Sequence, residues 1–308
     1  MIINLFYSKG LVGLALLATF FTACGTRIDQ ATPTPPGSET GTAALTGLPS
    51  ATTSAPTLTP TEEALAARVN GQGISLADFE AELALYQMAT GVEPTPEERQ
   101  RVLGSLIDQT LLVQAASEKG YTVDEAVLQG RLDGLASSLG GEAALAQWIG
   151  DHGYHEQSFR KALAGAVAAT WMRDQITAAV PKTVEQVHAR QILVYDSKAA
   201  DEIYALLEAG NDFGNLAEQY DPVTGGDLGW FPRSYLLDAG LEAAAFDLQP
   251  GQYSTVIQTV AGFHILQVTE RALLHPLTPE ALLILQSQAM QDWLKERRLQ
   301  SEIDILLT

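Results

Sequence analysis

The chain has 308 residues, a length that allows about two domains. It carries 37 acidic residues against 18 basic ones, which gives a formal net charge of −19. This excess of negative charge argues against nucleic acid as a partner and against electrostatic docking on anionic lipid, because both are themselves negatively charged.

Residues 1–23 are typical of a secretory signal peptide. Lys9 supplies a positive charge near the start, and an apolar run follows from Leu11 to Phe21. That run is too short to span a bilayer, which needs about 20 apolar residues. We therefore expect the protein to be exported.

The segment around Cys24 indicates a lipid anchor. The run Phe21-Thr22-Ala23-Cys24-Gly25 is similar to a bacterial lipobox, although Phe21 stands where leucine is usual. Cys24 is the only cysteine, so the chain can form no internal disulfide. We expect Cys24 to be lipidated and to hold the protein on the outer face of the bacterial cell membrane. The alternative is an ordinary signal peptide followed by a chance cysteine.

Residues 24–61 are rich in Thr, Pro, Ala, Gly and Ser and have little apolar bulk. Such a segment cannot bury enough apolar surface to offset the entropy lost when the chain is ordered. We expect a disordered tether that holds the folded part away from the membrane surface.

Residues 62–182 are predicted to form a helical domain. A short extended turn is expected over residues 69–74, after which Ser75 caps a helix with Asp78 three positions on. Gly120 is suitably placed to end a later helix. Helical spacing of apolar residues is found over residues 97–119, 124–139, 142–150 and 156–180.

The last segment, residues 272–308, is predicted to contain one long helix from Thr278 to Leu307. Its apolar residues, Trp293 among them, lie at helical spacing and would form an exposed stripe on an isolated helix. This helix must therefore pack on another part of the protein.

Between these helical parts, residues 183–271 alternate short strands with short helices. Strands are expected over 189–194, 228–231 and 264–268, and helices over 213–220 and 241–246. Gly225 and Gly226, just before the second strand, leave room for the close approach of another backbone segment.

This order of elements, with its GGDLGWF and GFHILQV runs, resembles the parvulin-type (PpiC-like) peptidyl-prolyl isomerase domain. The runs VNGQGISLADFE and LIDQTLLVQAASEKGYTV are similar to the N-terminal chaperone region of SurA- and PrsA-type foldases. The resemblance implies an α+β fold with a helical chaperone domain and a small domain of antiparallel sheet with surrounding helices. It also implies that the C-terminal helix packs back onto the helical domain. The alternative for the helical part is a domain unrelated to chaperoning.

The reaction of such a domain does not require chemically reactive side chains. Rotation about an X-Pro bond must cross a barrier of about 18–20 kcal/mol, but no bond is made or broken. The reaction needs no nucleophile, metal or cofactor, and we assign none. The catalyst must favour the twisted amide over both planar forms. An apolar, dry pocket suits this task because the twisted amide is less charge-separated.

The resemblance implies which residues form the site. The family pairs two histidines on neighbouring strands; His264 stands at the second position and Gln191 replaces the first. Gln191 can donate and accept hydrogen bonds but cannot titrate. Thr259 matches the family's hydroxyl on the preceding strand end, and Asp221 stands in a shortened loop where the family carries an acidic residue. His188 lies three positions from Gln191, so it faces the other side of a regular strand.

The apolar wall that holds the proline ring maps, by the same resemblance, onto Leu236 and Leu241. Phe246 stands where a pocket or core aromatic is expected. The alternative for these side chains is a role in the hydrophobic core alone, and a strand histidine such as His264 is often a satisfied core residue.

Two functions agree with these observations. The first is an extracytoplasmic foldase that isomerises X-Pro bonds in translocated proteins and assists their folding. The second is a non-catalytic holdase with a degenerate parvulin domain, because Gln191 and the shortened loop at Asp221 both depart from the family pattern. Both predict unfolded or newly translocated polypeptides as partners and leave a homodimer open.

Overall fold

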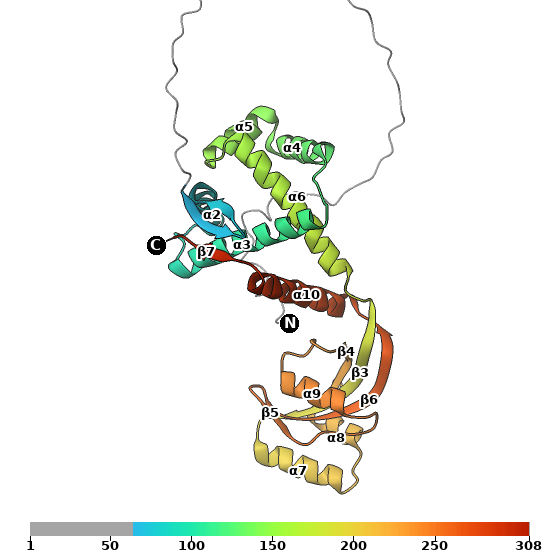
Figure 1. The fold of residues 1–308 in the computed structure, drawn as a ribbon. Coiled ribbons are helices and arrows are strands. Elements are labelled where there is room, and N and C mark those ends of the chain that lie inside the picture. The colour runs from blue at the N-terminus through green and yellow to red at the C-terminus, as the bar shows by residue number, and fades with distance from the viewer. Residues whose placement is uncertain (1–63, 308) are drawn as a thin grey trace, which may run out of the picture. The chain divides into compact units, whose positions relative to one another are not determined.

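The computed structural model of the protein describes residues 64–307 (Figure 1). The predicted signal peptide, Cys24 and the predicted tether lie outside the described residues. Within residues 64–307 there is no helix long and apolar enough to cross a membrane.

A three-stranded sheet contains the first described elements of the chain. Strands β1 (Leu65–Val69) and β2 (Gln72–Ser75) pair antiparallel, and β7 (Ile303–Ile305) lies on the other side of β1. Asn70 and Gly71 link β1 to β2 with φ angles of 50° and 80°, which suits the twist of a two-residue hairpin. The segment expected as an extended turn is therefore the tip and second strand of a hairpin.

The helices that follow agree with the sequence pattern in number and order. They are α2 (Leu76–Thr90), α3 (Pro96–Glu118), α4 (Glu125–Leu139), α5 (Glu142–Asp151) and α6 (Glu156–Ala178). The predicted cap of α2 is confirmed, because Ser75 Oγ accepts a hydrogen bond from the Asp78 amide at 3.0 Å. Gly120 follows the end of α3 with a φ of 79°, a conformation that glycine adopts without strain.

The predicted C-terminal helix is correct at its start and wrong at its end. Helix α10 (Pro279–Leu299) begins after Thr278, whose hydroxyl accepts a hydrogen bond from the Ala281 amide at 3.1 Å. The helix stops at Leu299, and the chain then becomes strand β7, after which the Leu306 amide bonds to the Ala66 carbonyl at 3.0 Å. The open edge of β1 offers main-chain partners that a sequence pattern alone does not show.

Contacts divide the chain into two compact units: residues 64–107, 131–158 and 304–307 form one, and residues 108–130 and 159–303 form the other. In the second unit, α10 packs against buried residues of α3 and α6. The buried residues are Leu112, Ala115, Ala116, Ala168, Ala169 and Met172, and Met290, Trp293 and Leu294 of α10 pack on them. The expected return of the last helix to the N-terminal helices is thereby confirmed.

The rest of the second unit is a four-stranded antiparallel sheet with helices on both faces (Figure 1). Its strands are β3 (Thr183–Val194), β4 (Asp227–Pro232), β5 (Ile257–Thr259) and β6 (Gly262–Pro276), in the order β4-β3-β6-β5. Its helices are α7 (Ser197–Glu208), α8 (Phe213–Tyr220) and α9 (Ala239–Asp247). The predicted α+β class is confirmed.

Two hydrophobic cores lie on opposite faces of this sheet, because side chains alternate along each strand. On one face Ile192 and Ile265 pack with residues of α7 and α8. On the other face Val187, Leu266 and Val268 pack with Ala245 and Phe246 of α9. The second face carries the candidate site.

Strands β3 and β6 are longer than the sequence pattern predicts. Their register extends from Val194 opposite Phe263 to Thr183 opposite Pro276, and the Leu277 amide bonds to the Lys182 carbonyl at 2.9 Å. The chain thus enters and leaves the small domain through a paired ribbon. Main-chain hydrogen bonds hold this ribbon together. Its Leu273 and Leu274 are both exposed, so this part of β6 lacks the alternation of apolar and polar residues by which a strand is predicted.

Candidate active site

The glycine pair before β4 brings two backbone segments into contact. Gly226 has a φ of 74°, and its carbonyl accepts a hydrogen bond from the Gln191 amide at 2.8 Å. A Cβ atom at Gly226 would lie 1.9 Å from the Gln191 carbonyl oxygen. Only glycine fits here, and the close approach predicted from the sequence fixes the backbone that carries Gln191.

His264, Gln191 and Thr259 form one hydrogen-bonded chain. His264 Nδ1 lies 2.9 Å from Gln191 Oε1, and His264 Nε2 lies 2.9 Å from Thr259 Oγ1. The Ala261 amide donates to the same Thr259 oxygen at 3.0 Å. This pattern fits a neutral ring with its proton on Nδ1 and with Nε2 accepting the Thr259 hydroxyl proton.

The His264 ring is buried, with 4% of the residue exposed. Burial lowers the pKa of His264 below its ordinary value of 6.5, because the charged ring would lose its hydration. The carboxylate of Asp238 opposes this shift by favouring the cation. The ring is therefore neutral at neutral pH, in agreement with its hydrogen bonds.

An apolar surface covers the same face of the sheet. Leu236 and Leu241 are half-buried and pack on the cluster around Val187, Leu266 and Val268. Ile257, which pairs with His264 in the register of β5 and β6, joins the same cluster. The predicted wall residues and the histidine thus belong to one continuous face.

Phe246 lies deeper than a pocket wall. It is 3% exposed and meets Phe231 edge to face, with ring centroids 6.2 Å apart. The guanidinium of Arg233 lies 4.1 Å from its ring centroid on the outside. Of the two expected positions for this aromatic side chain, the structure places it in the core.

The carboxylate of Asp221 is hydrogen-bonded within its own loop. Its carboxylate accepts hydrogen bonds from the amides of Val223 and Thr224, each at 3.1 Å, and from the Thr224 hydroxyl. These bonds, the Thr224 hydroxyl first, lower the pKa of Asp221 below its ordinary value. The structure therefore brings Gln191, His264 and Thr259 together and uses Asp221 to close the shortened turn.

His188 faces away from this network, as strand alternation predicts. Its Nδ1 lies 2.7 Å from Thr269 Oγ1, and its Nε2 lies 3.4 Å from the Asp227 carboxylate. It cannot replace the missing family histidine.

Glu242 and Asp238 are two residues of this face that sequence reasoning missed. The Glu242 carboxylate accepts hydrogen bonds from the amides of Ser234, Tyr235 and Leu236 at 2.8, 3.0 and 3.2 Å. Asp238 caps α9 by accepting from the Leu241 amide at 2.9 Å. The sequence offered one signal, since both acids stand at the start of a helix, where carboxylates are favoured.

Comparison with known proteins agrees with this geometry. Residues 194–270 match the rotamase family described as the PPIC-type PPIASE domain. This match places a parvulin-type peptidyl-prolyl isomerase domain within the chain, over the sheet and helices described above.

The chain is also similar to proteins named Foldase protein PrsA. It is 36% identical over 127 residues to the protein of Geobacillus sp. (strain WCH70), covering 40% of this chain and 45% of the relative. It is 32% identical over 183 residues to that of Caldanaerobacter subterraneus subsp. tengcongensis, covering 55% of this chain and 56% of the relative. The chain therefore spans about half the length of these curated relatives.

Among solved structures, the chain is similar to a crystal structure of a peptidylprolyl isomerase (PrsA) from Bacillus cereus. The two are 22% identical, with a TM-score of 0.43, over 78% of this chain and 88% of that one.

Proposed function

We propose that this protein is an exported foldase that catalyses cis-trans isomerisation of X-Pro bonds in unfolded, newly translocated polypeptides. The observation that carries the proposal is the buried, neutral His264, bonded between Gln191 and Thr259 on a face covered by Leu236 and Leu241. The match of residues 194–270 to an isomerase family supports it.

Each side chain has a distinct role in this proposal. Leu236 and Leu241 hold the proline ring in an apolar environment, which favours the twisted amide over the planar forms. Gln191 and Thr259 fix the tautomer of His264, so that the ring orients the amide without carrying charge. No member of this network other than His264 titrates, so we expect the rate to be constant with pH above about 6.5, the ordinary pKa of histidine.

The rival function is a holdase with an inactive isomerase fold. Two observations favour it: Gln191 stands in place of a histidine, and Asp221 is bound within its own turn. A holdase would suppress aggregation of a client without changing the proline-limited phase of its refolding.

A refolding assay separates the two functions. The full chain is added in substoichiometric amounts to a client whose slow phase is limited by proline isomerisation. On the proposed function the wild-type protein accelerates that phase, Gln191→His matches or exceeds it, and Leu241→Ala slows it. Leu206→Ala, an exposed leucine of α7, is the matched control and should leave the rate unchanged. No acceleration by wild type at any concentration would leave the holdase as the function.

We further propose that Cys24 is lipidated and that the protein is held at the outer face of the bacterial cell membrane. The support is the sequence alone: a signal-like segment over residues 1–23, a lipobox-like run and a single cysteine. Lipoprotein modification adds more than one acyl chain, which stable anchoring requires.

A further inference from the structure

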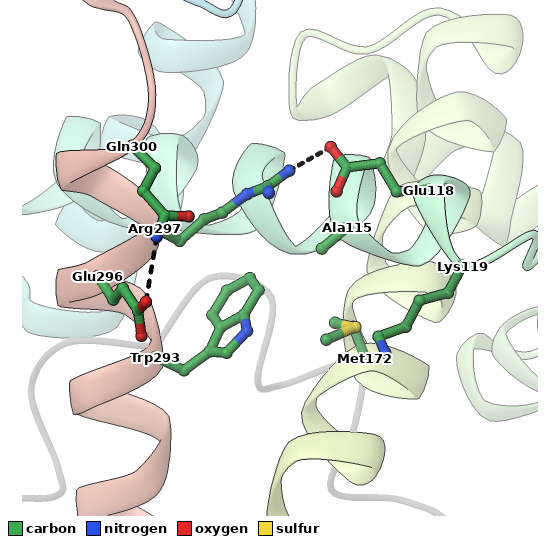
Figure 2. Close-up of a pocket in the computed structure, with 8 residues that line it drawn as sticks. All are labelled: Ala115, Glu118, Lys119, Met172, Trp293, Glu296, Arg297 and Gln300. Atoms are coloured by element: carbon green, nitrogen blue, oxygen red, sulfur yellow. Dashed lines mark hydrogen bonds and ion pairs between the residues drawn. The ribbon is translucent and has the colours of Figure 1, made fainter.

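A hollow lies in the helical part of the second unit and uses none of the residues around His264. It is a cavity of about 350 Å³ lined by residues from α3, α6 and α10 and from the turns that follow α3 and α10 (Figure 2). This volume is at the lower end of the roughly 300–1,000 Å³ typical of ligand pockets. It suits one side chain with its adjoining backbone better than a folded element.

The floor of this cavity is apolar and adaptable. Ala115 and Met172 are 4% and 3% exposed, and the half-buried indole of Trp293 faces Met172 across the hollow (Figure 2). Methionine is unbranched and polarizable, so it adapts to ligands of different shape. Tryptophan offers a large apolar surface and is a frequent anchor of binding energy.

One side of the cavity is held together by an ion pair. The Arg297 guanidinium of α10 binds the Glu118 carboxylate of α3. This pair joins two of the three helices that line the cavity. Arg297 Nε is buried and has no hydrogen-bond partner among the described residues.

The rest of the rim carries one cation, in the turn after α3, and one anion, on α10. Lys119 follows the end of α3, and Glu296 lies on α10, where its carboxylate accepts a hydrogen bond from the Gln300 amide group at 3.1 Å. In the described part of the chain, neither Lys119 nor Glu296 is in an ion pair. An ammonium donor and a carboxylate acceptor therefore stand on either side of an apolar floor.

We propose that this cavity binds one apolar side chain, of leucine or phenylalanine size, from an extended polypeptide. The side chain lies on Met172 and Trp293, Lys119 donates to a backbone carbonyl of the same segment, and Glu296 accepts from a backbone amide. A polypeptide backbone offers both groups at every residue except proline, which lacks the amide hydrogen. The site therefore selects an apolar residue other than proline. The inference rests on the proposed foldase function only for the kind of client, an unfolded polypeptide.

Binding of a defined peptide tests the site. The probe is a labelled, terminally blocked, proline-free peptide of Gly and Ser with one central Phe, and its binding to the full chain is measured by fluorescence anisotropy. Ala115→Met fills the cavity and should weaken binding about tenfold or more, because one apolar side chain loses its buried surface. Lys119→Gln should weaken binding severalfold. Lys161→Gln, an exposed lysine of α6, is the matched control and should bind like wild type.

Photo-crosslinking gives a second result that does not depend on a variant. The same peptide with benzoylphenylalanine at its centre should crosslink to Met172 or Trp293, as located by mass spectrometry. Crosslinks confined to other parts of the chain, or unchanged binding by a folded Ala115→Met protein, would overturn the inference. The proline-limited refolding rate of each variant, expected to equal that of wild type, separates failure of this site from failure of the isomerase function.

Discussion

The carboxylate of Glu242 controls the loop that carries Leu236, and its charge can be removed with little change in shape. It accepts from the consecutive amides of Ser234, Tyr235 and Leu236, in a loop where Ser234 has a positive φ of 66°. Glu242→Gln keeps one carbonyl oxygen and removes the charge. We expect the loop to loosen while the sheet and α9 keep their structure.

The magnitude follows from the number and exposure of these bonds. Hydrogen bonds to a charged group contribute about 1.5–3 kcal/mol, but Ser234 is exposed and Glu242 is half-buried, so water replaces part of the loss. We expect Glu242→Gln to reduce the free energy of local opening by about 1–2 kcal/mol. Since about 1.4 kcal/mol is a factor of ten, amide exchange at residues 234–236 should accelerate roughly five- to thirtyfold.

Hydrogen exchange followed by NMR or mass spectrometry reads these three amides directly. Glu218→Gln, an exposed glutamate of α8, is the matched control and should leave the loop unchanged. On the proposed function the proline-limited refolding rate should fall with Glu242→Gln, because Leu236 no longer holds the proline ring in place. Unchanged exchange at residues 234–236 in a folded variant would refute the argument.

Three further predictions concern titration and anchoring. Asp238→Asn keeps the cap of α9 but removes the negative charge that raises the pKa of His264. An NMR titration of the variant should therefore show a lower His264 pKa than in wild type. An equal or higher pKa would contradict the proposed effect of the Asp238 charge on His264. The folded-state pKa of His264 lies below its ordinary value of 6.5. The stability contributed by the neutral His264 ring is therefore complete above pH 6.5 and is lost as pH falls through the folded-state pKa. Burial, together with the negative charge of Asp78, raises the pKa of Glu82 from 4.5 to about 7. The stability contributed by the protonated Glu82 side chain is therefore complete below pH 4.5 and is lost as pH rises through 7. Urea unfolding at pH 5 and pH 8 should then show that Glu82→Gln stabilises the protein at pH 8 relative to wild type, and an equal midpoint at pH 8 counts against this. Cys24→Ala should release the protein from membranes or leave an uncleaved precursor, whereas a mature-length product that still partitions to membranes excludes lipidation.

The sequence was most informative where local rules act alone. The cap at Ser75, the start of the last helix at Thr278, the span of α8 and the close approach at Gly226 follow from short-range hydrogen bonding and glycine geometry. The resemblance to the parvulin family, carried by the GGDLGWF and GFHILQV runs and the order of the elements, also indicated Gln191 and His264, which meet across β3 and β6.

Only the tertiary structure decided the features that depend on long-range pairing. Strand β7 forms because the edge of β1 is open to it, and the ribbon from Thr183 to Pro276 exists because two distant segments pair. The structure also decided the place of Asp221, but for a local reason: its carboxylate accepts hydrogen bonds from the Val223 and Thr224 amides of the same short turn. Glu242 is placed beneath the loop of Leu236 by the packing of α9, and no spacing in the sequence reports how a helix is oriented on a sheet.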